Sequence, residues 1–430
     1  MEPYNIVSFL GIFACMGTAW VFSTDRRRMN WHAIGWGIGL QLLFALFVFI
    51  APAGTKAFLF VNKIAVSVLD AASEGAKCVF GPLALPPGTP GSLGFFLAFQ
   101  ALPTIIFFSA LVSILYFYGI MPALIKFFAR IFTRLMRVSG AESLCAASNI
   151  FVGVESAFTV RPHIRDMTRS ELCTVLTAGM ATVASNVLAL YVFTLQKQFP
   201  AIAGHLISAS FLSAPAALIM SKIMVPEKQT PRTLGLGIEP HYQKDSNVFE
   251  AVINGSQAGV KVIVGIVALL IAVLGLVALL DMILGGIGMK ANVMFGWGVD
   301  WSLKGLLGYA FRPIAFILGI PPADVPVAAR IIGQRAVLTE VASYQDLSAA
   351  LAAGSLQHPR SAVIIAYALC GFAHVASMSI FVGGVSALAP GRTGTLSRVA
   401  FRALVAATLA CLMTACVAGT FFTNRSVLLG

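Results

Sequence analysis

The sequence has 430 residues, of which 58% are hydrophobic and only 11% are charged. A soluble domain has about a quarter charged residues, so this composition excludes a soluble globular class and predicts a polytopic membrane protein. The formal net charge of +12 does not indicate nucleic-acid binding. Lysine and arginine occur in short clusters between long apolar runs, which is the distribution that orients membrane loops.

Long apolar runs predict eight transmembrane helices, because each helix needs about 20 residues to cross ~30 Å of hydrocarbon. Basic clusters follow the first, third and fifth runs and separate the last two, so all of them lie on one side if both termini are outside. The placement of the basic clusters therefore supports the prediction of eight transmembrane helices. The runs lie near residues 4–23, 32–52, 99–122, 172–195, 202–221, 262–283, 361–387 and 401–422.

Two further apolar segments, 141–165 and 322–350, are too short or too interrupted to span. As a helix, the stretch from Ala141 to Gly153 would cover only about 20 Å. We therefore predict two re-entrant hairpins, which must be shielded by protein or by a water-filled cavity. The first would enter from the cytoplasmic side after three spans, and the second from outside after six.

Each predicted hairpin is followed by a helix that small polar residues interrupt, GMATVASN (179–186) and CGFAHVAS (370–377). Two oppositely inserted copies of such a unit are typical of inverted-repeat transporters, whose binding site lies between the copies near the bilayer midplane. The predicted fold class is an all-α polytopic membrane protein. It has eight transmembrane helices, two oppositely oriented re-entrant helical hairpins, interfacial helices and an inverted repeat.

Three other segments have a different character. Residues 55–69 place apolar side chains at helical spacing with Lys56 and Lys63 on the other face, which predicts a helix lying in the membrane interface. The run 86–94 is rich in proline and glycine and predicts a loop. Residues 223–245 are interpreted as a solvated cytoplasmic linker.

Each predicted hairpin carries one acid, Glu155 in the first and Glu340 in the second. An ionisable group at membrane depth is costly and faces a cavity or a partner. In one interpretation each acid caps a helix or pairs with a nearby cation, Arg161 or Arg335. In the other it hydrogen-bonds a polar solute or carries a proton. A sugar suits the second interpretation, because a carboxylate accepts from two vicinal hydroxyls.

Four residues near the interruptions are further candidates. His374 is either a buried core residue or a binding group opposite the two acids. Asn149 and Asn186 either cap helices or supply, with freed backbone carbonyls, the hard oxygen ligands of a small cation. Phe372 either packs on a flat base or only fills space.

Signatures of enzymes and of resident metals are absent from the sequence. It contains no HExxH, GxSxG or GxxxxGK[ST] pattern. The seven cysteines form no CxxC pair and are interpreted as small buried hydrophobes. The first apolar run lacks a preceding basic region and is expected to be a retained span rather than a cleaved signal. We therefore expect a protein that is not an enzyme.

Eight motifs occur in order along the chain: ASEGAKCVFG (72–81), SILYFYGIM (113–121), NIFVGVES (149–156), MTRSEL (167–172), GMATVASNVLALYV (179–192), SAPAALIMSKIMVPE (213–227), IIGQRAVLTEVASYQDL (331–347) and CGFAHVASMSIFVGG (370–384). Together they closely resemble the concentrative nucleoside transporter family in its shorter bacterial form. The resemblance covers nearly the whole chain, and it is specific because several spaced motifs agree.

The resemblance implies a homotrimer that imports nucleosides together with Na⁺ or H⁺ and has no other cofactor. The hairpins and interrupted helices would move against a trimeric scaffold, with the first hairpin reading the base and the second the ribose. The implied solute-binding positions are Gly153, Val154, Glu155, Glu340, Phe372, His374 and Ser377. The implied cation-binding positions are Asn149, Val152, Asn186 and Val187, with Na⁺ held at Asn149 and Asn186.

The sequence also departs from the pattern of the family it resembles. Residues 153–155 read Gly-Val-Glu, one residue shorter than Gly-Gln-(Thr/Ser)-Glu and without the base-reading amide. Residues 339–341 read Thr-Glu-Val for Asn-Glu-Phe, His374 replaces a sugar-contacting Asn, and Asn186 replaces a Ser of the cation site. The ribose acid is kept, so a nucleoside-like solute is expected and the base preference stays open.

We therefore predict a secondary active, cation-coupled symporter that imports nucleosides, or a related ribosyl compound, by alternating access. It would lie in the bacterial inner membrane with both termini outside. A gated channel or a non-transporting membrane protein with the same fold is the alternative, and an enzyme acting on a lipid-linked substrate is a third interpretation. The predicted domains are an N-terminal scaffold (1–95), a gate region (96–197) and a C-terminal transporter region (198–430).

Overall fold

The computed structural model describes residues 3–153 and 155–423, and this part of the chain is helical, with an isolated backbone bridge between Ser139 and Leu234. The predicted all-α class is confirmed. Within the described residues, seven helical segments are long and apolar enough to cross a membrane: Pro3–Val21, Trp31–Phe49, Leu97–Phe117, Arg169–Leu195, Ile202–Met224, Val248–Phe295 and Pro390–Phe421. The predicted span 361–387 is instead divided into two shorter helices.

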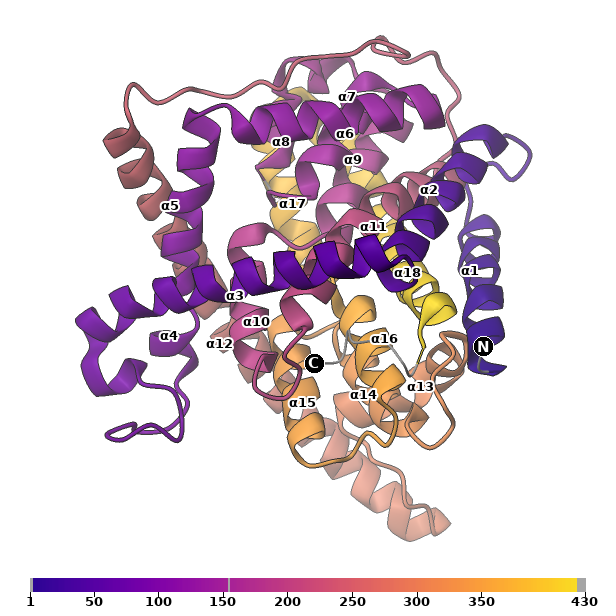
Figure 1. Cartoon of the computed structure of the whole chain (residues 1–430). Coiled ribbons are helices and arrows are strands. Elements are labelled where there is room, and N and C mark those ends of the chain that lie inside the picture. The colour runs from indigo at the N-terminus through magenta and orange to yellow at the C-terminus, as the bar shows by residue number, and fades with distance from the viewer. Residues whose placement is uncertain (1–2, 154, 424–430) are drawn as a thin grey trace.

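The N-terminal part contains two apolar helices followed by a long helix that runs across the front of the molecule (Figure 1). That long helix is α3, which extends well beyond the predicted 55–69. The predicted loop 86–94 is present. The elements are α1 (Pro3–Val21), α2 (Trp31–Phe49), α3 (Pro52–Phe80), η1 (Gly81–Ala84), α4 (Leu97–Gln100), α5 (Thr104–Phe117) and α6 (Ile120–Met136).

The predicted third span, 99–122, is wrong at its C-terminal end. The helix stops at Phe117 because Gly119 adopts a φ of 74°, a left-handed conformation that glycine tolerates and other residues rarely adopt. A separate amphipathic helix, α6, then carries the basic cluster Lys126, Arg130 and Arg134.

The middle of the chain forms a helical hairpin followed by an interrupted helix. We call residues 140–166 the first hairpin and residues 182–184, where α9 stops and α10 starts, the first break. The elements are α7 (Gly140–Asn149), α8 (Ser156–Thr159), η2 (Arg161–Asp166), α9 (Arg169–Ala181), α10 (Ser185–Leu195), α11 (Ile202–Met224) and α12 (Val248–Phe295).

The C-terminal part repeats this order. Residues 325–352 form the second hairpin, and residues 370–374 form the second break, where Gly371 has a φ of 148°. The first hairpin lies toward one end of the molecule and the second toward the other (Figure 1). The elements are α13 (Leu303–Ile317), α14 (Val325–Gln334), α15 (Glu340–Ala352), α16 (Pro359–Leu369), α17 (Val375–Leu388), η3 (Pro390–Arg392) and α18 (Thr393–Phe421).

Burial separates a central group of helices from the periphery. In their most apolar stretches, 83% of the α9–α10 residues and 89% of those in α11 are buried, compared with 6% in α12. At 48 residues, α12 is far longer than the predicted span 262–283. It packs on α5 through Gly255 and Gly259, four residues apart, where a Cβ would lie 2.7 Å from Ser109 O and from Ile106 Cα respectively. Small residues at this spacing allow close helix contact in membranes.

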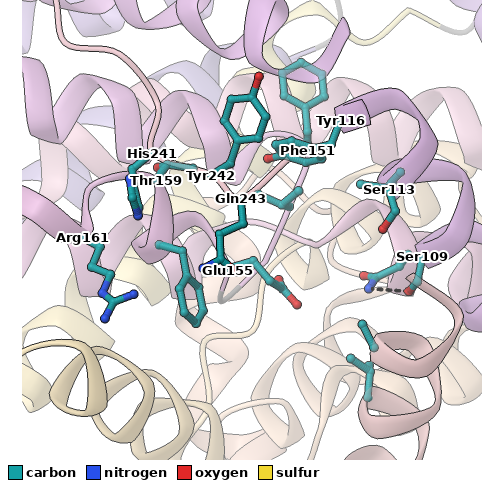
Figure 2. Close-up of a pocket in the computed structure, with 16 residues that line it drawn as sticks. Ser109, Ser113, Tyr116, Phe151, Glu155, Thr159, Arg161, His241, Tyr242 and Gln243 are labelled. Carbon is teal, nitrogen blue, oxygen red and sulfur yellow. Dashed lines mark hydrogen bonds between the residues drawn. The ribbon is translucent and has the colours of Figure 1, made fainter. Parts of the chain in front are cut away.

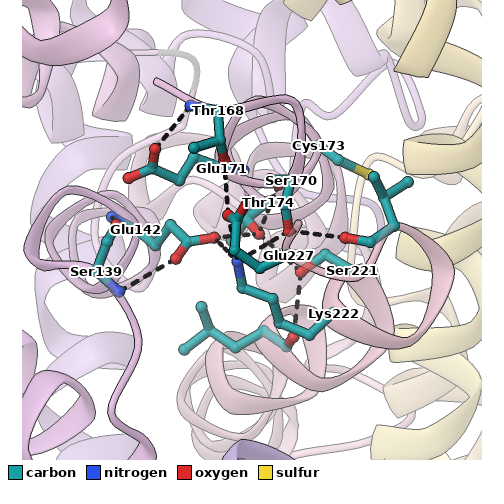
Figure 3. A network of polar contacts seen from close by, with 12 residues as sticks. Ser139, Glu142, Thr168, Ser170, Glu171, Cys173, Thr174, Ser221, Lys222 and Glu227 are labelled. Carbon is teal, nitrogen blue, oxygen red and sulfur yellow. Dashed lines mark hydrogen bonds and ion pairs between the residues drawn. The ribbon is translucent and has the colours of Figure 1, made fainter. Parts of the chain in front are cut away.

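A buried polar network ties the base of the first hairpin to α9 and α11 (Figure 3). Glu142 of α7 forms an ion pair with Lys222 of α11 and accepts a hydrogen bond from Thr174 Oγ1 of α9 at 2.8 Å. Lys222 also donates to Ser170 Oγ at 3.0 Å. Buried charges are tolerated when they are paired and hydrogen-bonded, so this network fixes the end of the hairpin that lies away from its tip.

The starts of α7 and α9 are set by the sequence itself. Ser139 and Glu142 form a capping box in which each side chain accepts from the other's backbone N–H, both at 3.2 Å. Thr168 and Glu171 form a second one, at 2.8 and 3.1 Å. A capping box satisfies N–H groups that a helix start leaves without partners.

Candidate solute and cation site

The tips of both hairpins, both breaks and α12 enclose a cavity of about 450 Å³, which we call the main cavity. It has the size of a small-molecule pocket, for which ~300–1,000 Å³ is usual. The cavity brings together six of the seven predicted solute positions: Gly153, Glu155, Glu340, Phe372, His374 and Ser377. The seventh, Val154, lies outside the described residues.

Glu340 is the buried acid of the main cavity, with 3% of its surface exposed. It is the first residue of α15, at the tip of the second hairpin. Tyr191 of α10 donates its hydroxyl to Oε1 at 2.8 Å, and His374 Nε2 lies 2.9 Å from Oε2. Oε2 makes no aligned hydrogen bond within the described residues, so it retains acceptor capacity.

The proposed pairing of Glu340 with Arg335 is not what the structure shows. The Arg335 guanidinium is buried and donates from Nη1 to Ala368 O at 2.5 Å, near the end of α16. Because this carbonyl precedes the second break, it has lost its helical partner. Arg335 therefore stabilises the broken helix, and the Glu340 carboxylate is left to the cavity.

The hydrogen bonds of His374 define the roles of its two ring nitrogens in the neutral imidazole. The backbone N–H of Ser377 donates to His374 Nδ1 at 3.2 Å, which caps the start of α17. An acceptor nitrogen carries no proton, so the ring proton of the neutral imidazole lies on Nε2, toward Glu340. Ser377 Oγ in turn donates to His374 O at 2.8 Å. Both residues are thus oriented by the break itself.

Glu155 occupies a different environment. It is exposed rather than buried, and it lines both the main cavity and a neighbouring one. It precedes α8 without capping it through its side chain. Among the described residues no cation lies within ion-pair distance of Glu155, so the predicted alternative of a pair with Arg161 is not seen.

The neighbouring cavity, which we call the side cavity, measures about 360 Å³. It shares Glu155 and Asn186 with the main cavity. Figure 2 shows Ser109 and Ser113 along one wall, Arg161 and His241 on the opposite side, and Glu155 between them.

The predicted cation positions lie where the first hairpin meets the first break. Ser185 N donates to Phe151 O at 3.2 Å and joins the two segments. The amide nitrogens of Asn149 and Asn186 donate to Cys145 O at 3.0 Å and Ser109 Oγ at 3.2 Å. Both amide oxygens are buried and, within the described residues, accept no hydrogen bond.

Val152 and Val187 flank the two asparagines and are buried. Close packing joins the segments here, since a Cβ on Gly153 would lie 2.9 Å from Ala184 Cβ. A buried amide oxygen without a donor is costly. The residues present therefore suit a small cation, which takes neutral oxygen ligands.

Two residues of the site were missed by sequence reasoning: Tyr191, which is buried behind Glu340, and Lys261, which lines the main cavity. Tyr191 was treated as part of an apolar helix, although a phenol in such a run needs a partner for its hydroxyl. Lys261 of α12 lines the cavity, and the predicted span started one residue after it. Had the helix been extended to its start at Val248, a lysine inside an apolar helix would have signalled a cavity.

Two interrupted helices, two hairpins toward opposite ends of the molecule, and between them a largely apolar cavity with a few polar side chains are typical of one class, the secondary membrane transporters. Comparisons with known proteins identify the family. Residues 205–419 match the model of the Na⁺ dependent nucleoside transporter C-terminus, residues 10–83 that of its N-terminus, and residues 98–198 a nucleoside recognition domain named Gate. The chain belongs to the concentrative nucleoside transporter family, and the prediction that it is not an enzyme is confirmed.

Relatives and solved structures agree with this assignment. The chain is 35% identical to an uncharacterized transporter of Haemophilus influenzae, over 96% of this chain and 97% of that one. It is 34% identical to mouse solute carrier family 28 member 3, but spans only 58% of that protein's length.

The structure of CNTnw in an inward-facing substrate-bound state matches with a TM-score of 0.87 and 34% identity, covering 97% of this chain and 98% of CNTnw. A variant of CNTnw in an outward-facing state matches with a TM-score of 0.87 as well.

Proposed function

We propose that this protein is a cation-coupled symporter that carries nucleosides, or a related ribosyl compound, across the bacterial inner membrane by alternating access. The observation that carries the proposal is the placement of Glu340. Its carboxylate is buried at the tip of a hairpin, is held by Tyr191 and His374, and borders a cavity of nucleoside size. Vicinal hydroxyls donate well to such an acceptor.

In this mechanism the ribose hydroxyls donate to Glu340, while Glu155 and His374 contact the base or the remaining hydroxyls. Phe372 and Ser377 complete the solute wall beside the second break. The amide oxygens of Asn149 and Asn186, with backbone carbonyls near Val152 and Val187, would bind Na⁺. Binding there fixes the tip of the first hairpin against the first break, so the affinities for ion and solute are linked through one coupling free energy.

The membrane arrangement follows from the same features. We propose eight spans with both termini outside, in which the α16–α17 pair forms the seventh and α18 the eighth, and two re-entrant hairpins of opposite insertion. The hairpins and broken helices would move as the transport domain. The exposed apolar surface of α12 and the length of α3 suit a scaffold that contacts lipid and two further copies of the chain in a homotrimer.

Uptake into proteoliposomes tests the proposal. Purified protein is reconstituted and offered uridine, cytidine, adenosine, guanosine or inosine under an inward Na⁺ gradient. We expect at least one nucleoside to accumulate above its outside concentration and an ionophore to abolish the accumulation. Equilibration without accumulation would instead support a gated channel, and no uptake of any nucleoside by folded protein would reject the proposal.

The coupling ion is tested in the same vesicles. A Na⁺ gradient at equal pH is compared with a pH gradient in the absence of Na⁺. We expect the Na⁺ gradient to drive accumulation, because the buried amide oxygens are ligands for a hard cation rather than for a proton. Accumulation driven only by the pH gradient would assign the coupling to H⁺, with His374 and the two acids as candidate carriers.

A further inference from the structure

The side cavity has features of a ligand site that the mechanism above does not use. Three hydroxyl-bearing residues of α5 line it together with Val112: Ser109, Ser113 and Tyr116. Their spacing of four and then three places them on a single helical face. An apolar membrane helix that turns its hydroxyl-bearing face to a cavity indicates a water-filled or solute-filled space rather than a packing gap.

Aromatic rings supply the apolar part of this wall. Tyr116 packs on Tyr242 with ring centroids 5.9 Å apart, and Phe151 and Phe158 also line the cavity. Flat heterocycles stack well on such rings whatever their identity, because every base has a π face. A nucleobase is the part of the proposed solute that fits this surface.

Charged and polar groups form the remaining part of the wall of the side cavity. Arg161 and Gln243 line the cavity together with Glu155. Within the described residues, neither Arg161 nor Glu155 has an ion-pair partner, and both are exposed. A guanidinium presents a planar fork of donors that suits the carbonyl edge of a base, and an amide both donates and accepts.

The linker between α11 and α12 forms the cover of the side cavity. His241 N donates to Thr159 O at 2.9 Å, and Arg232 pairs with Asp166 at 2.7 Å, so the linker is fastened to the first hairpin. Gly140 N donates to Thr233 O at 2.8 Å at the base of the same hairpin. In the proposed topology this linker is cytoplasmic, which places the side cavity on the cytoplasmic route out of the main cavity.

We propose that the side cavity is a second nucleoside-binding site, occupied during release to the cytoplasm. The base stacks among the rings of Tyr116, Tyr242 and Phe158, and Arg161 and Gln243 bind its polar edge. Glu155 borders both cavities, so it contacts the solute in either position. This inference rests on the proposed function and adds to it a site that the transport model with one cavity does not contain.

Binding stoichiometry tests the second site directly. Equilibrium dialysis in detergent, at saturating Na⁺, uses whichever of the five radiolabelled nucleosides accumulates fastest. We expect two nucleosides per chain in the wild type, one in Arg161→Ala and one in Glu340→Gln. Arg165→Ala and Tyr118→Ala, whose exposed side chains lie outside both cavities, serve as matched controls and should keep two.

Transport measured from each side of the membrane distinguishes a lost binding contact from a folding defect, because a folding defect would affect both sides equally. Half-saturation is measured for uptake into intact cells and into inside-out vesicles. For Tyr242→Ala and Gln243→Ala we expect the nucleoside concentration at half-saturation to rise about tenfold on the cytoplasmic side. On the external side it should change by less than about twofold, because the lost polar or stacking contact acts on one side only. Equal changes on both sides would overturn the inference.

The outcomes separate the two proposals. One nucleoside per chain in the wild type, lost in Glu340→Gln and kept in Arg161→Ala, would overturn the second site and leave the proposed function intact. No binding and no uptake by folded wild-type protein would overturn both. If Arg161→Ala does not fold, Gln243→Ala carries the stoichiometry test in its place.

Discussion

The tips of the two hairpins carry the same charged group in opposite surroundings. Glu340 is buried, and both of its oxygens lie against side chains from the two broken helices. Glu155 is exposed between two cavities and lacks an ion-pair partner among the described residues. The second tip is therefore preorganised for one kind of ligand, while the first is held mainly by its junction with the first break. We infer that the second tip sets solute class and the first sets ion dependence and release.

The largest effect should come from Glu340→Gln. The substitution removes the charge that two sugar hydroxyls would use, and each hydrogen bond to a charged group is worth about 1.5–3 kcal/mol. We expect initial nucleoside uptake to fall about 100-fold or more. Glu74→Gln is the control, because Glu74 is an exposed residue of α3 that pairs with Lys77 at the surface. Wild-type rates in Glu340→Gln would remove the basis for the ribose assignment.

The next largest effect is expected for Asn149→Ala, which deletes a buried oxygen at the first tip. Loss of one ligand should raise the Na⁺ concentration for half-maximal uptake about tenfold. Saturating Na⁺ should restore nucleoside binding, because the solute contacts are unchanged. An unaltered Na⁺ dependence would place the coupling ion elsewhere.

Glu155→Gln should have a smaller effect than either. The carboxylate is exposed, and water and salt screen its interactions. We expect uptake to fall by about fivefold to tenfold, corresponding to one charged hydrogen bond of ordinary strength. A loss as large as that of Glu340→Gln would contradict the contrast between the two tips.

The smallest effect is predicted for His374→Asn. Asparagine can accept from Ser377 N and so cap α17, and its amide N–H can donate toward Glu340 as the imidazole would. We therefore expect nucleoside affinity to fall by less than about fivefold, since both contacts of the imidazole can be replaced. A loss as large as that of Glu340→Gln would contradict this role of His374.

The sequence predicted much of the fold because helix interruptions and hairpins are encoded locally. Small polar residues at 179–186 and 370–377 mark both breaks, and the distance from Ala141 to Gly153 is too short to cross a bilayer. The ends of the spans were less predictable. Hydropathy alone could not show that Gly119 turns the chain.

The composition of the site was predicted only in part. Glu340, His374 and the two asparagines could be selected, since polar groups in apolar runs stand out. The contacts of these residues could not be predicted. Tyr191 and Glu340, for example, are hydrogen-bonded but lie 149 residues apart in sequence. Lys261 and the cover formed by residues 241–243 are brought to the cavities by tertiary packing, which no local pattern reports. The exposure of Glu155 likewise depends on the space between segments rather than on its neighbours in the chain.

A thermodynamic cycle between a solute hydroxyl and Glu340 tests the central claim most directly. Binding of a nucleoside and of its 2′-deoxy and 3′-deoxy forms is measured by titration calorimetry for the wild type and for Glu340→Gln. We predict that removing a hydroxyl from the nucleoside weakens binding to the wild type by about 1.5–3 kcal/mol. The same removal should leave the binding free energy of the variant almost unchanged. Equal losses in both proteins would show that Glu340 does not contact the sugar and would contradict the account.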